Sequence, residues 1–440
     1  MGPTNLAKTQ GQPGQNLAYL ATISLMVLPF INLAGLVGFV LLLGLGLCYR
    51  GQAVVKWLWR RGFVALAIAL AISTFFAGDR AEALLQLTNF LPYFLLLGVL
   101  AVWLPTLRNP FAQLEEWASW LTITTLPINL LAIAEYVLMA PAMAQRLQQP
   151  VLAWLYRLSL DQDFGHRANA IFDHPNTLAC YLTLILGLNL GLIFSQSLQT
   201  PSERSVGVWP YLSQYLWPRP VWLYLSAGLI LVGIFCSGSR NGLLVAIIEV
   251  LIVIACGQRQ RTVMLAGMGG ILAIAAAAFI GGIGGRQLST RLFTDDPRLS
   301  VWRIALEQIQ AHPIWGVGLG NFKLLYVPDS IPGYDNIYHA HNFWLHLAAE
   351  AGIPTAIALT VLVGWGCYQG VKALLDTKAF PAQRWLVGGY GLAFLSCLLF
   401  SLFDVTLYEV RISLLGWLSL AVLYSAPQLL NQLSRPQTKK

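Results

Sequence analysis

Charged side chains are scarce in this sequence. Only 10% of the 440 residues are Asp, Glu, Lys or Arg, against about a quarter in a typical soluble domain. Hydrophobic residues make up 57% of the chain and fall into long blocks, many of them near the ~20 residues that a helix needs to cross a bilayer. This pattern excludes a soluble globular protein and predicts an all-α polytopic membrane protein.

Cysteine is also rare. The six cysteines include no CxxC pair and lie in or at the ends of apolar blocks. We therefore expect small buried core residues, with no disulfide framework and no metal site. The net charge of +8 comes mostly from Lys and Arg in short loops between apolar blocks, which is a membrane-topology signal. No basic domain remains to bind nucleic acid.

The apolar blocks predict about twelve membrane-spanning helices. The predicted spans are 17–31, 33–49, 62–78, 88–105, 118–140, 176–196, 220–238, 241–257, 262–284, 342–368, 384–403 and 410–426. Pro29, Asn32 and Gly35 mark a turn between the first two spans. A single tilted helix over 17–49 is the alternative, and it would reverse every later orientation.

Loop charges favour two crossings in that first block. With an inside N-terminus, Arg50, Arg60, Arg108 and most other loop Lys and Arg residues face the cytoplasm, as the positive-inside rule predicts. The tails 1–16 and 427–440 are then cytoplasmic. The polar N-terminus lacks the features of a cleavable signal, so we expect the first apolar block to be retained.

Two long outside segments follow from this topology, about 141–175 and 285–341. The second contains an amphipathic stretch, Leu299 to Ala311, with Trp302, Ala305, Leu306 and Ile309 at helical spacing. A glycine-punctuated turn follows it. We expect this segment to form one large structured periplasmic loop that caps the membrane domain.

Histidines cluster where that loop meets the next predicted span. His339, His341 and His346 lie within eight residues, and a neutral imidazole can take up a proton near working pH. His339 and His341 are only two positions apart, and the nearest carboxylates, Asp335 and Glu350, complete no familiar zinc spacing. A proton-transfer role therefore fits better than a metal site, and a structural role stays open for each histidine.

Arginines occupy the same face. Ser237-Gly-Ser-Arg240 forms a tight outer turn, where a guanidinium offers a planar set of donors to an anion or anchors the helix end. Arg298 and Arg303 begin the amphipathic stretch, while Arg286 and Arg291 fit a solvated surface. Arginines beside a histidine suggest phosphate stabilisation and proton removal from a hydroxyl.

These motifs resemble one known family. His341-Asn342, followed after nine residues by Gly352-Ile-Pro-Thr, resembles the histidine signature of the O-antigen ligase and Wzy-type polymerase superfamily. The Arg240 turn resembles the arginine turn of that family, and the run from Arg298 resembles the start of its large periplasmic loop. The segment from Arg167 to Ala179 looks like an upstream element of many members. The resemblance covers about residues 165–370 by motif.

The resemblance implies a metal-independent membrane glycosyltransferase in the bacterial inner membrane. Such enzymes move a glycan from a polyprenyl-diphosphate carrier to an acceptor hydroxyl at the periplasmic face, without a cofactor. By resemblance, Arg240 and Arg298 hold the diphosphate and His341 activates the acceptor. The expected substrate-binding residues are Arg303, Arg167, His339 and Asn342. The acceptor is a lipid A core sugar, another glycan or a protein side chain, which leaves ligase and polymerase both open.

Two other functions stay open. One family branch is described as inorganic-carbon transporters, so a small-anion (bicarbonate) transporter is the first alternative. It needs polar groups near the bilayer midplane, where Glu135 and Glu249 have the wrong sign for an anion. Each of these carboxylates is a functional candidate or is paired near a helix end. A non-catalytic scaffold is the second alternative, and it does not need the clustering of His and Arg.

Overall fold

A computed structural model describes most of the chain. The described ranges are 4–138, 164–199, 219–257, 297–328, 336–377 and 379–433, with a few further positions between 265 and 331. The elements within these ranges are helices, so the predicted all-α class is confirmed.

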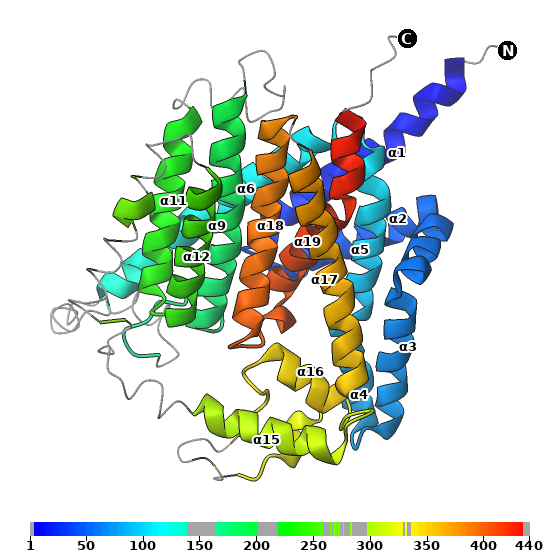
Figure 1. Cartoon of the computed structure of the whole chain (residues 1–440), viewed down its shortest axis with the longest axis vertical. Coiled ribbons are helices and arrows are strands. Elements are labelled where there is room, and N and C mark those ends of the chain that lie inside the picture. Colours follow the sequence, from blue (N-terminus) through cyan, green and yellow to red (C-terminus); the bar gives the residue numbers. More distant parts are fainter. Residues whose placement is uncertain are drawn as a thin grey trace.

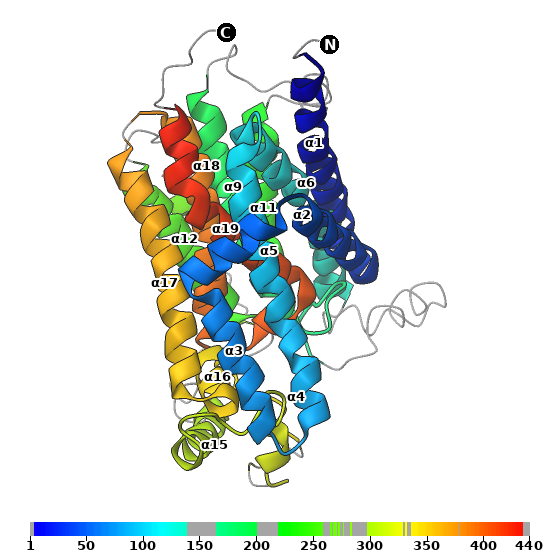
Figure 2. The ribbon, with the colours of Figure 1, turned by 90° about the vertical axis from the view of Figure 1, so that its right-hand side faces the viewer.

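The long helices stand side by side in one bundle (Figure 1). They are α1 (Thr4–Val27), α2 (Asn32–Arg61), α3 (Phe63–Ser73), α5 (Leu91–Trp103), α6 (Pro110–Leu138), α9 (Pro175–Leu198), α11 (Arg219–Cys236), α12 (Arg240–Cys256), α17 (Ile353–Asp376), α18 (Pro381–Ser401) and α19 (Val410–Leu433). The two termini lie at one end of the bundle (Figures 1 and 2). Three further helices lie at the other end: α4 (Arg80–Gln86), α15 (Arg298–Ala311) and α16 (Phe343–Ala351).

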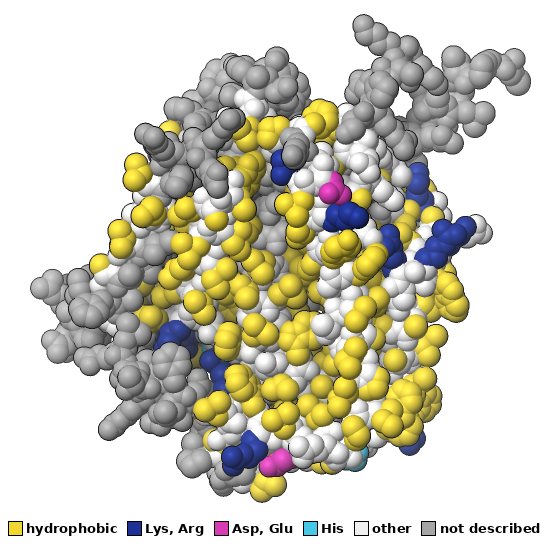
Figure 3. All heavy atoms as spheres, viewed as in Figure 1, with side chains coloured by type: hydrophobic (Ala, Val, Ile, Leu, Met, Phe, Trp, Pro, Cys, Tyr) yellow, Lys and Arg dark blue, Asp and Glu magenta, His cyan; other side chains and the backbone are white. Residues whose placement is uncertain are grey.

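The bundle has the surface of a membrane protein. Seven helices of the described ranges are long and apolar enough to cross a membrane, and three shorter apolar helices accompany them. On α17, Ile357, Val361 and Trp365 are exposed four residues apart, and hydrophobic side chains cover much of the flank in Figure 3. The chain is therefore a multi-pass membrane protein. The count of twelve stays a prediction, because span 262–284 lies mostly outside the described residues.

Helix α9 forms the centre of the bundle and packs closely against α18. A Cβ added to Gly191 of α9 would lie 2.5 Å from the Cα of Gly389 of α18, so only glycine permits this approach, as is common between membrane helices. Close packing brings the start of α9 beside the end of α18. These two ends, with the turn that follows α18, carry part of the candidate site.

The predicted span 342–368 is wrong, because two helices occupy it. Helix α16 ends at Ala351, and α17 begins at Ile353. Between them Gly352 has φ 86° and ψ 159°, a region that is essentially restricted to glycine. A Cβ there would lie 1.9 Å from the Ile314 carbonyl oxygen. The histidine segment therefore leads into a short helix outside the candidate span Ile353–Asp376.

Other predictions agree in outline and differ in detail. The helix break near Pro29 is present between α1 and α2, while α1 and α19 extend into the predicted tails. The amphipathic helix α15 is confirmed, but its Leu306 is exposed and Gln308 is buried. Cys48 and Cys256 are exposed, so the expectation of buried cysteines is wrong for these two.

Candidate functional site

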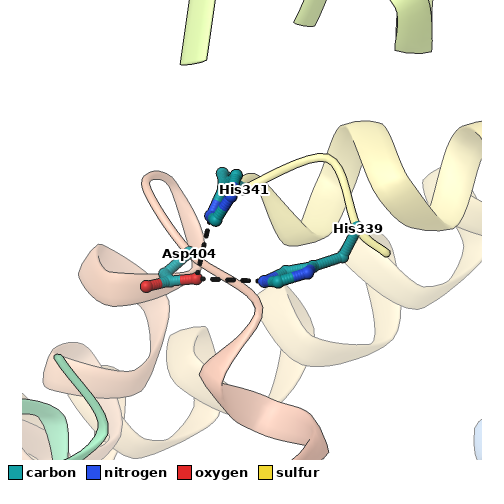
Figure 4. Close-up of side chains that lie close together, drawn as sticks. All are labelled: His339, His341 and Asp404. Atoms are coloured by element: carbon teal, nitrogen blue, oxygen red, sulfur yellow. Dashed lines mark hydrogen bonds and ion pairs between the residues drawn. The ribbon is translucent and has the colours of Figure 1, made fainter. Parts of the chain in front are cut away.

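A histidine pair and one carboxylate meet at the end of the bundle opposite the termini. The Nδ1 atom of His341 lies 3.4 Å, and the Nε2 atom of His339 lies 3.6 Å, from Oδ1 of Asp404. Figure 4 shows both rings directed at that one oxygen. The carboxylate side chain is 11% exposed, whereas the two imidazoles are about one third exposed. The rings are thus open to an incoming substrate while their anchor is buried.

Local backbone geometry aims His341 at this anchor. His341 has φ 47°, a left-handed conformation that is uncommon for residues other than glycine. The next residue, Asn342, caps α16 by accepting a hydrogen bond from the Leu345 N–H, and its amide donates to the Leu402 carbonyl. Asn342 therefore ties the histidine segment to the turn that carries Asp404.

The second oxygen of Asp404 leads to an arginine. Asn176, the second residue of α9, donates from Nδ2 to Oδ2 of Asp404 over 3.0 Å. Arg167 donates from Nη2 to Oδ1 of the same asparagine over 2.7 Å. The N-cap residue His174 accepts a hydrogen bond from the Asn176 N–H. Asp404 thus connects the histidine pair to Arg167 through a single amide.

Arg167 also binds the turn that precedes Arg240. Its Nε atom donates to the Ser237 carbonyl over 3.0 Å, and the neighbouring Ala168 N–H donates to the Cys236 carbonyl over 2.9 Å. Ser239 caps α12, whose first residue is Arg240. Three segments that the sequence singled out separately therefore meet at one end of the bundle.

Two buried charges hold the loop that carries Arg167. Glu135 accepts hydrogen bonds from the backbone N–H groups of Asn169 and Ala170. Arg411 donates to the Ile171 carbonyl and stacks on the ring of Phe172, which is also in this loop. Glu135 thus has a structural partner near a helix end.

Helix α15 carries Arg298 and Arg303 and packs against α16. Arg298 is half-buried as the first residue of this helix, and Arg303 is exposed one turn further on. Arg286 and Arg291 lie outside the described residues. Contacts through Asp404 and Asn176 thus connect His341, His339 and Arg167, and Asn342 binds the turn that carries Asp404. Arg298 lies on a helix that packs against α16, which follows the histidine segment.

Electrostatics keep the carboxylate charged. Burial alone would raise the pKa of Asp404, but its interactions with His339 and His341 outweigh burial and hold that pKa well below the ordinary value. Burial lowers the pKa of His174 to about 4, so this imidazole is neutral at neutral pH. The site therefore offers a fixed negative charge beside the imidazole rings of His339 and His341.

Sequence reasoning missed three residues of this cluster. Asp404 lies 63 positions after His341 in a short turn without a motif, while Asn176 and His174 belong to the upstream element but had no assigned role. The ligand atoms of His339, His341 and Asp404 all lie within 4.8 Å of one another and could hold a metal ion. The sequence shows no zinc spacing because Asp404, the carboxylate that meets the two histidines in space, is far from them in the chain.

Comparison with known proteins supports the sequence-based resemblance. Residues 225–360 match the family model described as O-Antigen ligase. The matched region includes Arg240, Arg298 and His341, so the resemblance to this superfamily is confirmed. No curated protein matches the chain. The match supports a membrane glycosyltransferase of the ligase or polymerase type, with glycan and lipid-linked substrates.

Proposed function

We propose that this protein transfers a glycan from a polyprenyl-diphosphate carrier to an acceptor hydroxyl at the periplasmic face of the bacterial inner membrane. The observation that supports the proposal is that both carboxylate oxygens of Asp404 make contacts. One carboxylate oxygen faces His339 and His341, and the other binds Asn176, which binds Arg167. A base and a cation are thereby held around one buried anchor.

His341 is the general base of this proposal. Its Nδ1 faces the carboxylate of Asp404, which favours the tautomer with the proton on Nδ1 and the lone pair on Nε2. A buried aspartate that orients an imidazole and stabilises the imidazolium is the logic of catalytic triads. His339 faces the same oxygen and supports the negative charge of that anchor.

The transfer balances without a metal or nucleotide. Nε2 of His341 takes the proton of the acceptor hydroxyl as its oxygen attacks the anomeric carbon of the donor glycan. The bond from that carbon to the diphosphate oxygen breaks, and the electron pair leaves with the diphosphate. Arg240 and Arg298 stabilise the departing charge, with Arg167 and Arg303 as further phosphate-binding groups. The imidazolium then returns its proton to the solvent.

Anion transport receives less support from the described residues. Glu249 lies in α12 and accepts a hydrogen bond from Ser396 of α18 over 2.7 Å, and Glu135 binds backbone amides. Both membrane carboxylates thus join elements of the bundle. A scaffold, in turn, gives no reason for directing two imidazoles at one buried carboxylate.

The test is glycan transfer by the purified protein in lipid vesicles. A polyprenyl-diphosphate oligosaccharide and candidate acceptors would be supplied, and the product detected by mass. His341→Ala, Arg240→Ala and Arg298→Ala should each abolish transfer, while EDTA leaves it intact. Arg108→Ala, an exposed arginine between α5 and α6, is the matched control. Transfer that survives all three substitutions would refute the mechanism.

A further inference from the structure

A cavity of about 260 Å³ opens beside His339 of the histidine pair. Its walls come from α4, α16, the segment between α15 and α16, and the turn after α18. The side chains that matter here are Glu82, Gln86, Lys323, Tyr338, His339 and Tyr408. His339 belongs both to this cavity and to the Asp404 cluster, so the cavity borders the proposed base.

The polar groups of the cavity are fixed and their charges cancel. Lys323 forms an ion pair with Glu82 over 3.1 Å, and Gln86 donates to the same carboxylate over 2.9 Å. This leaves carboxylate and amide groups that can hydrogen-bond a hydroxyl, and no unneutralised Lys or Arg among the described lining residues. A diphosphate would gain little here, in contrast to the Arg167 and Arg240 side.

Two buried lining residues, Glu350 and His346, also add little net charge to the cavity. Glu350 and His346 line it and lie 3.4 Å apart, almost fully buried. Burial raises the pKa of Glu350 to about 8, and burial, aided by His339 and His341, lowers the pKa of His346 to about 3. Both groups are therefore mainly neutral at pH 7, and they add no field for an anion.

We propose that this cavity is the acceptor subsite and takes one uncharged sugar unit. The inference rests on the proposed function and adds the acceptor class. The volume is below the ~300–1,000 Å³ of pockets that hold drug-sized ligands, which suits a single ring. Fixed hydrogen-bonding groups beside the exposed aromatic ring of Tyr338 match the hydroxyl rim and apolar faces of a sugar. His339 lines the cavity and shares Asp404 with His341, so a sugar held here lies beside the proposed base.

Direct binding tests the subsite without any donor. The probes are neutral methyl glycosides of glucose, galactose and N-acetylglucosamine, with methyl glucuronide and glucose 6-phosphate as anionic probes. Binding to the full chain in nanodiscs is followed by saturation-transfer NMR. At least one neutral glycoside should bind, and neither anionic probe should bind more tightly. Glu82→Ala should weaken binding by about tenfold to a hundredfold, the loss expected for a hydrogen bond to a charged group.

Two further variants guard against misfolding. Tyr338 is 67% exposed, so Tyr338→Ala should fold normally and still weaken glycoside binding. Glu307→Ala removes an exposed carboxylate of α15 and should bind like the wild type. Binding of anionic probes alone, no binding at all, or wild-type binding by both Glu82→Ala and Tyr338→Ala would overturn the subsite.

Glycoside binding also distinguishes a failure of the acceptor subsite from a failure of the proposed transfer reaction. His341→Ala should retain glycoside binding, because the base is not needed to hold the sugar. If glycosides bind but no transfer occurs, the glycosyltransferase proposal fails and the sugar site stands. If transfer occurs and glycosides do not bind, only the acceptor subsite fails.

Discussion

Asp404→Asn is the most informative substitution, because it changes a charge and almost no volume. The carboxylate faces His339 and His341 with one oxygen and Asn176 with the other. An amide keeps the shape but removes the negative charge that fixes the proton on Nδ1 and stabilises the imidazolium. We expect the variant to insert and bind the donor while its turnover falls.

The distance between His341 and Asp404 sets the size of the expected loss in kcat. At the 3.4 Å between His341 Nδ1 and Asp404 Oδ1, a full ion pair at an effective dielectric of about 20 is worth up to about 5 kcal/mol. The net value of a hydrogen bond to a charged group is lower, about 1.5–3 kcal/mol. Because the Asp404 side chain is mostly buried, we expect a loss between the hydrogen-bond value and the ion-pair value. Such a loss corresponds to a kcat reduced by about 10²- to 10³-fold.

Steady-state transfer in vesicles measures this effect, with melting temperature as the check on folding. Asp173→Asn makes the same chemical change at an exposed aspartate and should leave kcat unchanged. If Asp404→Asn keeps kcat within about threefold of the wild type while the protein melts normally, Asp404 does not support a base, and the assignment of His341 loses its main argument.

Two predictions concern residues of α16 and its C-terminal end. Glu350 keeps its proton to about pH 8 when folded and loses it near 4.5 when unfolded, so its stabilising contribution is complete below pH 4.5 and is lost as pH rises to 8, by about 1 kcal/mol per pH unit. Glu350→Gln should make the melting temperature less dependent on pH between pH 5 and 8. A melting temperature that falls with pH as steeply as in the wild type would contradict this. Gly352→Ala should destabilise the protein by about 2 kcal/mol or more, because of the backbone conformation and the contact with Ile314. Gly364→Ala places a methyl group in open space on α17 and should be neutral or stabilising. Chemical denaturation measures both variants, and equal effects of Gly352→Ala and Gly364→Ala would refute the argument.

Part of the candidate site was visible in the sequence because short motifs carried it. The Arg240 turn, the Arg298 run and the His341 signature are local patterns, and the family match over 225–360 contains all three. Asn342 and Gly352 belong to that signature, and they cap and end α16. Local hydrogen bonding and glycine-only dihedrals can be inferred from neighbouring residues.

The remaining residues depend on contacts between distant segments. Asp404 belongs to no motif in the sequence, and its role emerges only where the end of α18 meets the start of α9. That meeting depends on the close packing of Gly191 against Gly389, which no local pattern reveals. The cavity beside His339 likewise needs α4, far earlier in the chain, to supply Glu82.

Hydropathy, helix signals and short motifs act over neighbouring residues, so the membrane class, the all-α fold and the residue types available for chemistry can be read from the sequence. It placed a single span over 342–368, since apolar composition does not reveal that Gly352 must turn the chain. Only the folded chain shows that one buried carboxylate connects histidine and arginine, and that a cavity lined by Glu82 and Lys323 lies beside His339. Both are consequences of long-range packing, which brings together side chains separated by hundreds of residues.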